Sequence, residues 1–318
     1  MVREPPFPAD VTPISVRPKR ILQVAAQLRF RAFDFDIGCD DHQFRQTLDR
    51  GVPCPRLSLD PLFAAVPVFD WYQDFWAPVA LQHAMAVEHP DRVLFCGGVD
   101  PSFKGLEYAL EEIDRQILEL GAVSMKFYNA HINGPWNCDD PAIAYPMYER
   151  CRQNGVNVVQ FHKGIPFGTE DLRFGQHYDL QAPCRDFPDM TFILHHLAVP
   201  CVQETVAIAA RFPNMYLALS ANLCFTPIAP RLVPEQLGLL LSRVGADRLL
   251  WGSEAGLAGP PWVYLQAFMD LEIPLDLRSG YGYPQITRVD KRKILGENFA
   301  RVMGIDIEAK RKQLDLGG

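Results

Sequence analysis

The sequence predicts an α/β fold in which eight strands and eight helices form a (β/α)8 TIM barrel. From about residue 60 onward, apolar runs of strand length alternate with amphipathic segments of helix length. The apolar runs are nearly continuous, as is typical of parallel strands that are covered on both faces. The chain has 318 residues, of which 48% are hydrophobic, and this is enough to bury a large core.

Seven segments have the composition of buried strands, and an eighth strand would close the barrel. The seven are 62–69, 93–100, 122–129, 156–162, 191–197, 215–220 and 249–254. Segments with helical spacing of apolar residues lie between them, notably 106–120 and 141–155, and a last one spans 290–304. Two segments compete for the first strand. We prefer 7–14, which precedes a helix-like stretch, although 29–38 alternates better.

We expect one barrel domain over residues 1–318, because the sequence shows no repeat, no low-complexity run and no break in composition. A Pro-rich segment at about 1–20 and a polar insertion at about 38–60 are its irregular parts.

Composition excludes several classes of function. The net charge of -7 argues against a nucleic-acid partner, which would require a basic face. No apolar run has the length of a membrane span, and the first residues lack the apolar core of a secretory signal. The eight cysteines occur singly with no CxxC pair, which indicates neither a zinc knuckle nor a disulfide framework. We therefore expect a soluble, cytoplasmic protein.

Residues with metal-ligand chemistry lie at the ends of three predicted strands. His162 ends the strand at 156–162, His195 and His196 lie near the end of 191–197, and Glu254 ends 249–254. In a barrel of this kind the carboxyl ends of the strands form the active-site face, so these side chains should converge. Imidazoles with a carboxylate and no thiolate favour a divalent transition metal.

The two adjacent histidines and three further residues need separate interpretation. His195 and His196 are adjacent, so on a strand only one of them can face the barrel mouth. Lys126, near the end of 122–129, could pair with an acid, face a substrate anion or carry a bridging carbamate, and Tyr128 would line the same pocket. Lys163 follows His162 and should point behind the rim.

The chain resembles the amidohydrolase superfamily, in the branch of aminocarboxymuconate-semialdehyde decarboxylase and related hydrolases. The resemblance covers roughly 75–304. It rests on the order and spacing of "HPDRVLFCGGVDP", "GAVSMKFYN", "GVNVVQFHKGIP", "FPDMTFILHHLA", "DRLLWGSE" and "KILGENFARVMGID". It implies a (β/α)8 barrel with one or two metal ions at the carboxyl rim of the strands.

The resemblance also implies roles for individual residues. His162 matches a metal-binding histidine, and "HHLA" selects His196, which is a ligand in dinuclear members and a base or polariser in mononuclear ones. Glu254 stands where the family normally has an aspartate that binds metal and handles the proton of the nucleophilic water. Lys126 matches a lysine that is carbamylated in some members.

The chain departs from the family at the first strand, where an HxH or DxH motif is expected. "PADVTP" places Asp10 at the first ligand position, and "FDFDIG" would place Asp36 there. A carboxylate in place of an imidazole favours manganese or iron over zinc. We therefore expect one divalent ion (Mn, Fe or Zn) held by His162, His196, Glu254 and Asp10.

Two functions follow from this interpretation. The first is an enzyme with one metal ion that hydrolyses a C–N or C–O bond of a small-molecule substrate or decarboxylates a small organic acid, with His196 and Glu254 as catalytic residues. The alternative is the reduced-site subunit of a two-component Mn/Fe monooxygenase of the isobutylamine N-hydroxylase type. In either case we expect a homo- or hetero-oligomer, in the second with a related amidohydrolase-like chain. A scaffold subunit without metal is a third interpretation, which the retained ligand types disfavour.

Overall fold

A single parallel sheet organises the computed structural model, which describes residues 79–91, 93–130, 134–166, 170–254 and 261–313. Its strands follow chain order: β1 (Cys96–Gly98), β2 (Ser124–Phe127), β3 (Val158–Phe161), β4 (Thr191–His195), β5 (Met215–Ala218) and β6 (Leu249–Leu250). Each strand pairs in parallel with the next, so that Gly98 is in register with Lys126 and Lys126 with Gln160. Each of the six strands lies within a segment predicted from the sequence.

The remaining sequence expectations about the amino-terminal part fall on residues 1–78. The strand at 62–69, both candidates for the first strand, Asp10, Asp36 and the segments at 1–20 and 38–60 all lie outside the described residues.

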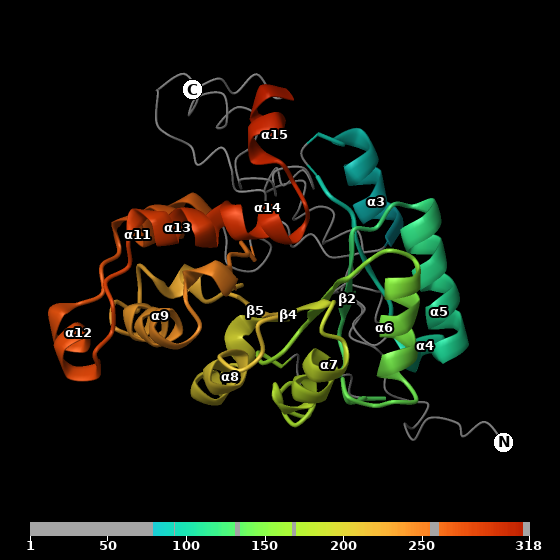
Figure 1. The fold of residues 1–318 in the computed structure, drawn as a ribbon, viewed down its shortest axis with the longest axis horizontal. Helices are drawn as coiled ribbons and strands as arrows, with labels where there is room; N and C mark the ends of the chain where they lie inside the picture. Colours follow the sequence, from blue (N-terminus) through green and yellow to red (C-terminus); the bar gives the residue numbers. More distant parts are fainter. Residues whose placement is uncertain (1–78, 92, 131–133, 167–169, 255–260, 314–318) are drawn as a thin grey trace, which may run out of the picture.

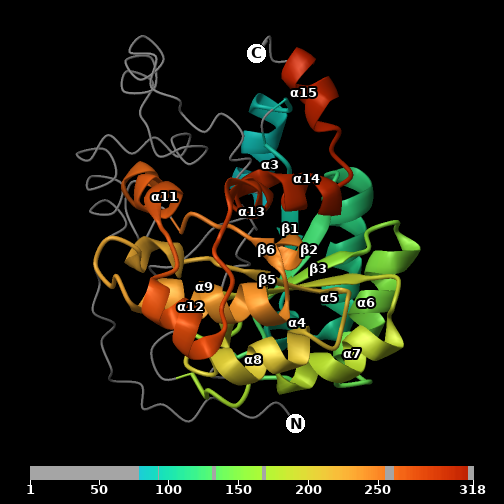
Figure 2. The ribbon, with the colours of Figure 1, turned by 60° about the vertical axis from the view of Figure 1, so that its left-hand side comes forward.

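Helices cover the outside of the sheet and connect successive strands (Figures 1 and 2). The α-helices are α3 (Val79–Glu88), α4 (Pro101–Lys104), α5 (Leu106–Asp114), α6 (Ala144–Gln153), α7 (Gln181–Asp186), α8 (Val202–Ala209), α9 (Leu232–Arg243), α11 (Pro261–Asp270), α12 (Leu275–Tyr281), α13 (Arg288–Arg292), α14 (Asn298–Val302) and α15 (Ile307–Gln313). Shorter 3-10 turns are η3 (Tyr178–Leu180), η4 (His196–Ala198), η5 (Leu223–Phe225) and η6 (Ala246–Arg248). None of the helices in the described ranges is long and apolar enough to span a bilayer.

Two predicted helices contain a π-helical turn. The segment 106–120 consists of α5 and η2 (Arg115–Glu119), and 290–304 contains most of α13 followed by η7 (Lys293–Glu297) and α14. In η2 the buried side chain of Gln116 accepts from the backbone N–H of Gly98, at 2.9 Å, and donates to the Gly98 carbonyl, at 3.1 Å. The helix is therefore tied to the end of β1 at this turn.

The strands have two different faces, as the period of two along a strand requires. On β4, Phe192 and Leu194 pack in the large core cluster that the helices share. Ile193 points to the other side and packs with Val158 and Leu250 in a second, smaller cluster. We call this second side the inner face, and it determines which strand-end side chains meet.

Candidate metal centre

Polar side chains replace apolar ones along the inner face toward the carboxyl ends of the strands. On β3, Val158 is followed at two-residue steps by Gln160 and His162, and on β4 Ile193 is followed by His195. Gln160 Oε1 lies 2.9 Å from His195 Nε2, which places these two side chains together above the apolar layer. The parallel arrangement therefore brings the polar ends of neighbouring strands to one edge of the sheet.

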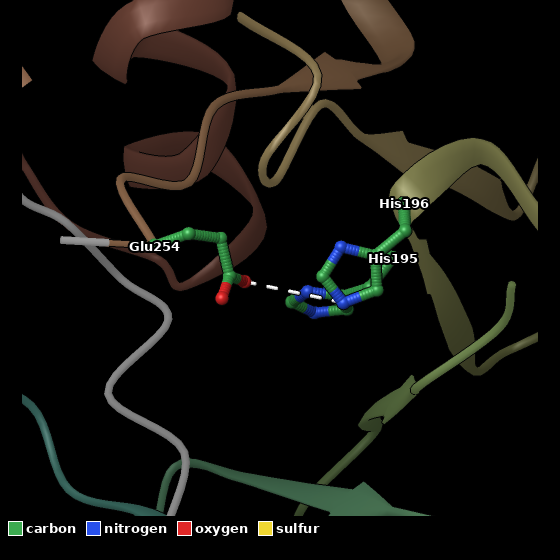
Figure 3. A group of neighbouring side chains, drawn as sticks. All are labelled: His195, His196 and Glu254. Atoms are coloured by element: carbon green, nitrogen blue, oxygen red, sulfur yellow. Dashed lines mark ion pairs between the residues drawn. The ribbon is translucent and has the colours of Figure 1, made fainter. Parts of the chain in front are cut away.

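Two histidines and one glutamate form a compact group of metal-ligand types at this edge. His195, His196 and Glu254 each offer one ligand atom, and these atoms lie within 4.8 Å of one another. Figure 3 shows the carboxylate of Glu254 pointing toward both imidazoles, with His196 Nε2 3.9 Å from Glu254 Oε1. Both histidines are buried, whereas the side chain of Glu254 is 25% exposed.

Both histidines of the adjacent pair reach this group, contrary to the expectation that only one could face the barrel mouth. Strand β4 ends at His195, and His196 begins a turn with left-handed backbone, with φ of 60°. Strict alternation of side chains ends with the strand, so the ring of His196 returns toward the edge. Its Nδ1 donates to the carbonyl of Ser220, at 3.0 Å. Left-handed backbone in a residue other than glycine costs about 1–3 kcal/mol and is concentrated at functional sites.

His162 contacts the group through His196, since His162 Nδ1 lies 3.1 Å from His196 Nε2. The other ring nitrogen of each histidine faces a backbone carbonyl. His162 Nε2 lies 3.0 Å from the Ile165 carbonyl and His196 Nδ1 lies 3.0 Å from that of Ser220. Because a carbonyl only accepts, each of these nitrogens must carry the proton. In the neutral rings, the two nitrogens that face each other are therefore both acceptors.

This arrangement fits a metal ion. Two imidazole nitrogens that bind one ion at about 2.1 Å lie about 3.0–3.4 Å apart for bond angles of about 90–109°. The separation of 3.1 Å between His162 Nδ1 and His196 Nε2 is within this range. Metal-binding imidazoles usually donate their second N–H to a carbonyl or carboxylate, as both of these histidines do.

The electrostatics keep the imidazoles in the form that binds metal. Burial lowers the pKa of His162 and of His195 well below the usual value, and the neighbouring cationic groups lower it further. Burial also lowers the pKa of His196, to about 4, although Glu254 opposes the shift. At neutral pH all three rings are therefore unprotonated at one nitrogen, as coordination requires.

The two predicted pocket residues lie beside the histidines. The ring of Tyr128 stacks on His162 with 5.0 Å between centroids. Lys126 Nζ is 5.2 Å from the centre of the Tyr128 ring and 3.4 Å from His195 Nδ1. Burial, and next the charge of Glu254, raise the pKa of Tyr128, so its hydroxyl stays protonated. The two side chains therefore place an ammonium group and a hydroxyl-bearing ring next to the imidazoles.

Sequence reasoning did not select His195, and it placed Lys163 away from the site. The signal in the sequence that could have identified His195 is the pair "HH" itself. The alternation of side chains along a strand allowed only one of the two histidines to face the site, and the resemblance selected His196. Lys163 does point away from the imidazoles and forms a buried ion pair with Asp179, at 2.9 Å. Of the proposed ligands, Asp10 lies outside the described residues.

Solved structures with the same fold support the barrel prediction. An uncharacterized TIM-barrel protein from Bordetella bronchiseptica is 25% identical, with 72% of this chain and 73% of that chain covered and a TM-score of 0.57. An amidohydrolase II is 13% identical, with 90% and 96% covered and a TM-score of 0.53. Among curated proteins, none matches the sequence significantly. The α/β barrel predicted from the sequence is confirmed.

The family assignment rests on the sequence itself. The profile that describes the amidohydrolase family matches residues 41–305. This range includes all six described strands and the three strand ends that carry His162, His196 and Glu254. It also extends beyond residues 75–304, over which the resemblance to the amidohydrolase superfamily holds. The chain belongs to the amidohydrolase family.

Proposed function

We propose that this protein is a metal-dependent enzyme that hydrolyses a C–N or C–O bond of a small molecule or decarboxylates a small organic acid. Family membership supports this class of chemistry. The observation that carries the proposal is the 3.1 Å contact between His162 Nδ1 and His196 Nε2, in which two acceptor nitrogens face each other beside Glu254. One divalent ion accounts for this otherwise unfavourable contact.

His162, His196 and Glu254 would hold the ion, and Asp10 is the ligand that we propose from the first strand. A divalent ion bound there would polarise a substrate oxygen or lower the pKa of a bound water. The ion would be manganese, iron or zinc. If the carboxylate of Asp10 takes part, the ligand set favours manganese or iron over zinc.

The side chains of the site would divide the remaining work. Glu254 is partly exposed, and in this proposal its carboxylate would accept a proton from the attacking water and then donate it to the leaving group. His196 is fixed by its bond to the Ser220 carbonyl and would stabilise charge that develops on the substrate. Lys126 would hold an anionic group of the substrate, and the Tyr128 hydroxyl would donate a hydrogen bond to it.

The test is metal analysis followed by activity assays on the full chain purified alone. The protein is stripped with a chelator, reloaded separately with Mn²⁺, Fe²⁺ and Zn²⁺, and assayed on small amides, esters and carboxylic acids labelled with ¹³C in the carboxyl group. Release of labelled CO₂ identifies decarboxylation, and release of an amine or alcohol identifies hydrolysis.

Glu254→Gln should abolish the activity, whereas His177→Gln is a matched control because His177 is fully buried and bonds Thr205 outside the site. Occupancy below a tenth of an equivalent with every metal would refute the proposal. Activity of the chain alone would exclude an obligate partner, on which the monooxygenase alternative depends.

A further inference from the structure

A directional chain of hydrogen bonds lies on the inner face below the candidate metal centre. Gln160 Nε2 donates to Ser124 Oγ, at 2.9 Å, and to Cys96 Sγ, at 3.2 Å. Ser124 Oγ donates to the same sulfur, at 3.0 Å, and the thiol donates to the carbonyl of Gly97, at 3.6 Å. The amide nitrogen of Gln160 is therefore hydrogen-bonded to Ser124 and Cys96, and its Oε1 faces His195 Nε2.

This chain fixes the tautomer of His195. Because Gln160 Oε1 only accepts, His195 Nε2 must carry the proton at their 2.9 Å contact. The groups at the other nitrogen agree: Lys126 Nζ, which only donates, lies 3.4 Å from His195 Nδ1, and Ser220 Oγ lies 2.9 Å from it. The contacts at both nitrogens therefore leave the lone pair of His195 on Nδ1, where it faces Lys126 Nζ and Ser220 Oγ.

We propose that His195 is a further ligand of the metal ion, bound through Nδ1, and that Gln160 is the positioning residue that prepares this nitrogen. The inference rests on the metal-dependent function proposed above. His195 belongs to the group of ligand atoms that lie within 4.8 Å of one another. Its bond to Gln160 is the contact that a metal-binding imidazole makes through its second nitrogen.

The sequence gives an independent reason for a ligand at this position. No two histidines of the chain are separated by a single residue, so the chain has no HxH pair on any strand. The adjacent pair His195 and His196 instead supplies two imidazoles from one strand end, because the backbone of His196 is left-handed. With His162 and Glu254, the described residues would supply three imidazoles and one carboxylate to the centre.

The charge of Lys126 affects whether His195 can bind a metal ion. Its ammonium group lies 3.4 Å from His195 Nδ1, so a cationic group already occupies the position at which this lone pair would bind metal. Coordination of His195 would replace this contact, and Lys126 would then turn toward the substrate pocket beside Tyr128. Metal binding and the lysine contact are therefore expected to compete for one lone pair.

The experiment uses the full chain stripped with a chelator and titrated with Co²⁺ alone. Calorimetry gives the affinity, and visible absorption of bound Co²⁺ reports its coordination without any assay of activity. We expect His195→Gln to weaken binding by at least about 100-fold and Gln160→Leu by about 10–100-fold. Gln160→Glu keeps an acceptor oxygen for Nε2 and should restore binding, and His177→Gln should match the wild type.

The outcomes separate this inference from the function on which it rests. If the wild type binds no Co²⁺, the proposed function fails. If it binds Co²⁺ and His195→Gln has the same affinity and spectrum, only the role of His195 is overturned. If His195→Gln does not fold, X-ray absorption of wild-type protein with Co²⁺ decides: three imidazoles support the inference, and two overturn it. Wild-type affinity in Gln160→Leu would overturn the role of Gln160.

Discussion

Replacement of Lys163 by methionine is expected to lower the free energy of unfolding by about 3–5 kcal/mol, the usual cost of removing one partner from a buried ion pair. Lys163 is fully buried, and its Nζ lies 2.9 Å from both carboxylate oxygens of Asp179 and 2.9 Å from the carbonyl of Phe174. The Asp179 side chain is only 11% exposed. In the variant this carboxylate keeps the backbone N–H of Cys138, at 2.8 Å, and loses its cation.

The pH dependence of the effect has a definite sign. Burial by itself would lower the pKa of Lys163, but the charges of Asp179 and Cys138 and the hydrogen bonds to them together outweigh it, so the pKa lies above the usual 10.5. A raised pKa in the folded state means that the pair stabilises the protein fully below pH 10.5 and that this stabilisation is lost as the pH rises through the folded value. The difference between wild type and Lys163→Met should therefore shrink above pH 10.5.

The assay is equilibrium unfolding in urea, followed by the fluorescence of the five tryptophans, of which Trp136 and Trp251 are buried. Arg173→Met is the control, because Arg173 and its partner Asp171 form a pair at the surface, and it should leave the midpoint unchanged. A loss below about 1 kcal/mol in Lys163→Met, in the range of surface pairs, would refute the argument from burial.

Three further predictions concern the loops, the lysine and the ion. In the same urea assay, Gly164→Ala should lower the free energy of unfolding by more than about 2 kcal/mol, because φ of Gly164 is +77° and the new Cβ would lie 2.4 Å from Val199 N. Gly280→Ala is the control: there is open space around Gly280, so this variant should be neutral or more stable by up to about 1 kcal/mol. Lys126→Met should raise the affinity for Co²⁺ about tenfold or more, which corresponds to about 1.4 kcal/mol, because it removes a cation that lies beside His195. Weaker binding of Co²⁺ in calorimetry would instead identify Lys126 as a ligand. Saturation with Zn²⁺ or Mn²⁺ at 100 times the Kd should stabilise the wild type by about 2.7 kcal/mol, and a melting temperature unchanged by chelator would contradict this.

The fold could be predicted because buried parallel strands leave a strong signal in the sequence. Apolar runs such as 156–162 and 191–197 are nearly uninterrupted. Six of the predicted strand segments fall on described residues, and each of them contains a strand. Exact ends were harder to place. Strand β6 is only Leu249–Leu250, although the apolar run continues to Trp251, because the backbone leaves the ladder before the run ends.

The candidate site could be predicted in its residue types but not in its full membership. His162 and Glu254 are the last residues of their predicted strands, so a rule about strand ends selects them. The rule does not select His195, because strict alternation of side chains through His196 would point the two rings to opposite faces. The left-handed backbone that begins at His196 changes which rings can meet, and no pattern of hydrophobicity records the sign of φ.

The ligand atoms, as distinct from the ligand residues, depend on backbone carbonyls that a sequence pattern does not show. The carbonyl of Ile165 takes the Nε2 proton of His162, and the carbonyl of Ser220 takes the Nδ1 proton of His196. Had either carbonyl turned away, the same two histidines could form an ordinary hydrogen bond to each other, and no cation would be needed between them. The loops after β3 and β5 therefore determine that these imidazoles face each other as two acceptors. For this reason substitutions that shift the loops, such as Gly164→Ala, should weaken metal binding even though they leave every proposed ligand in place.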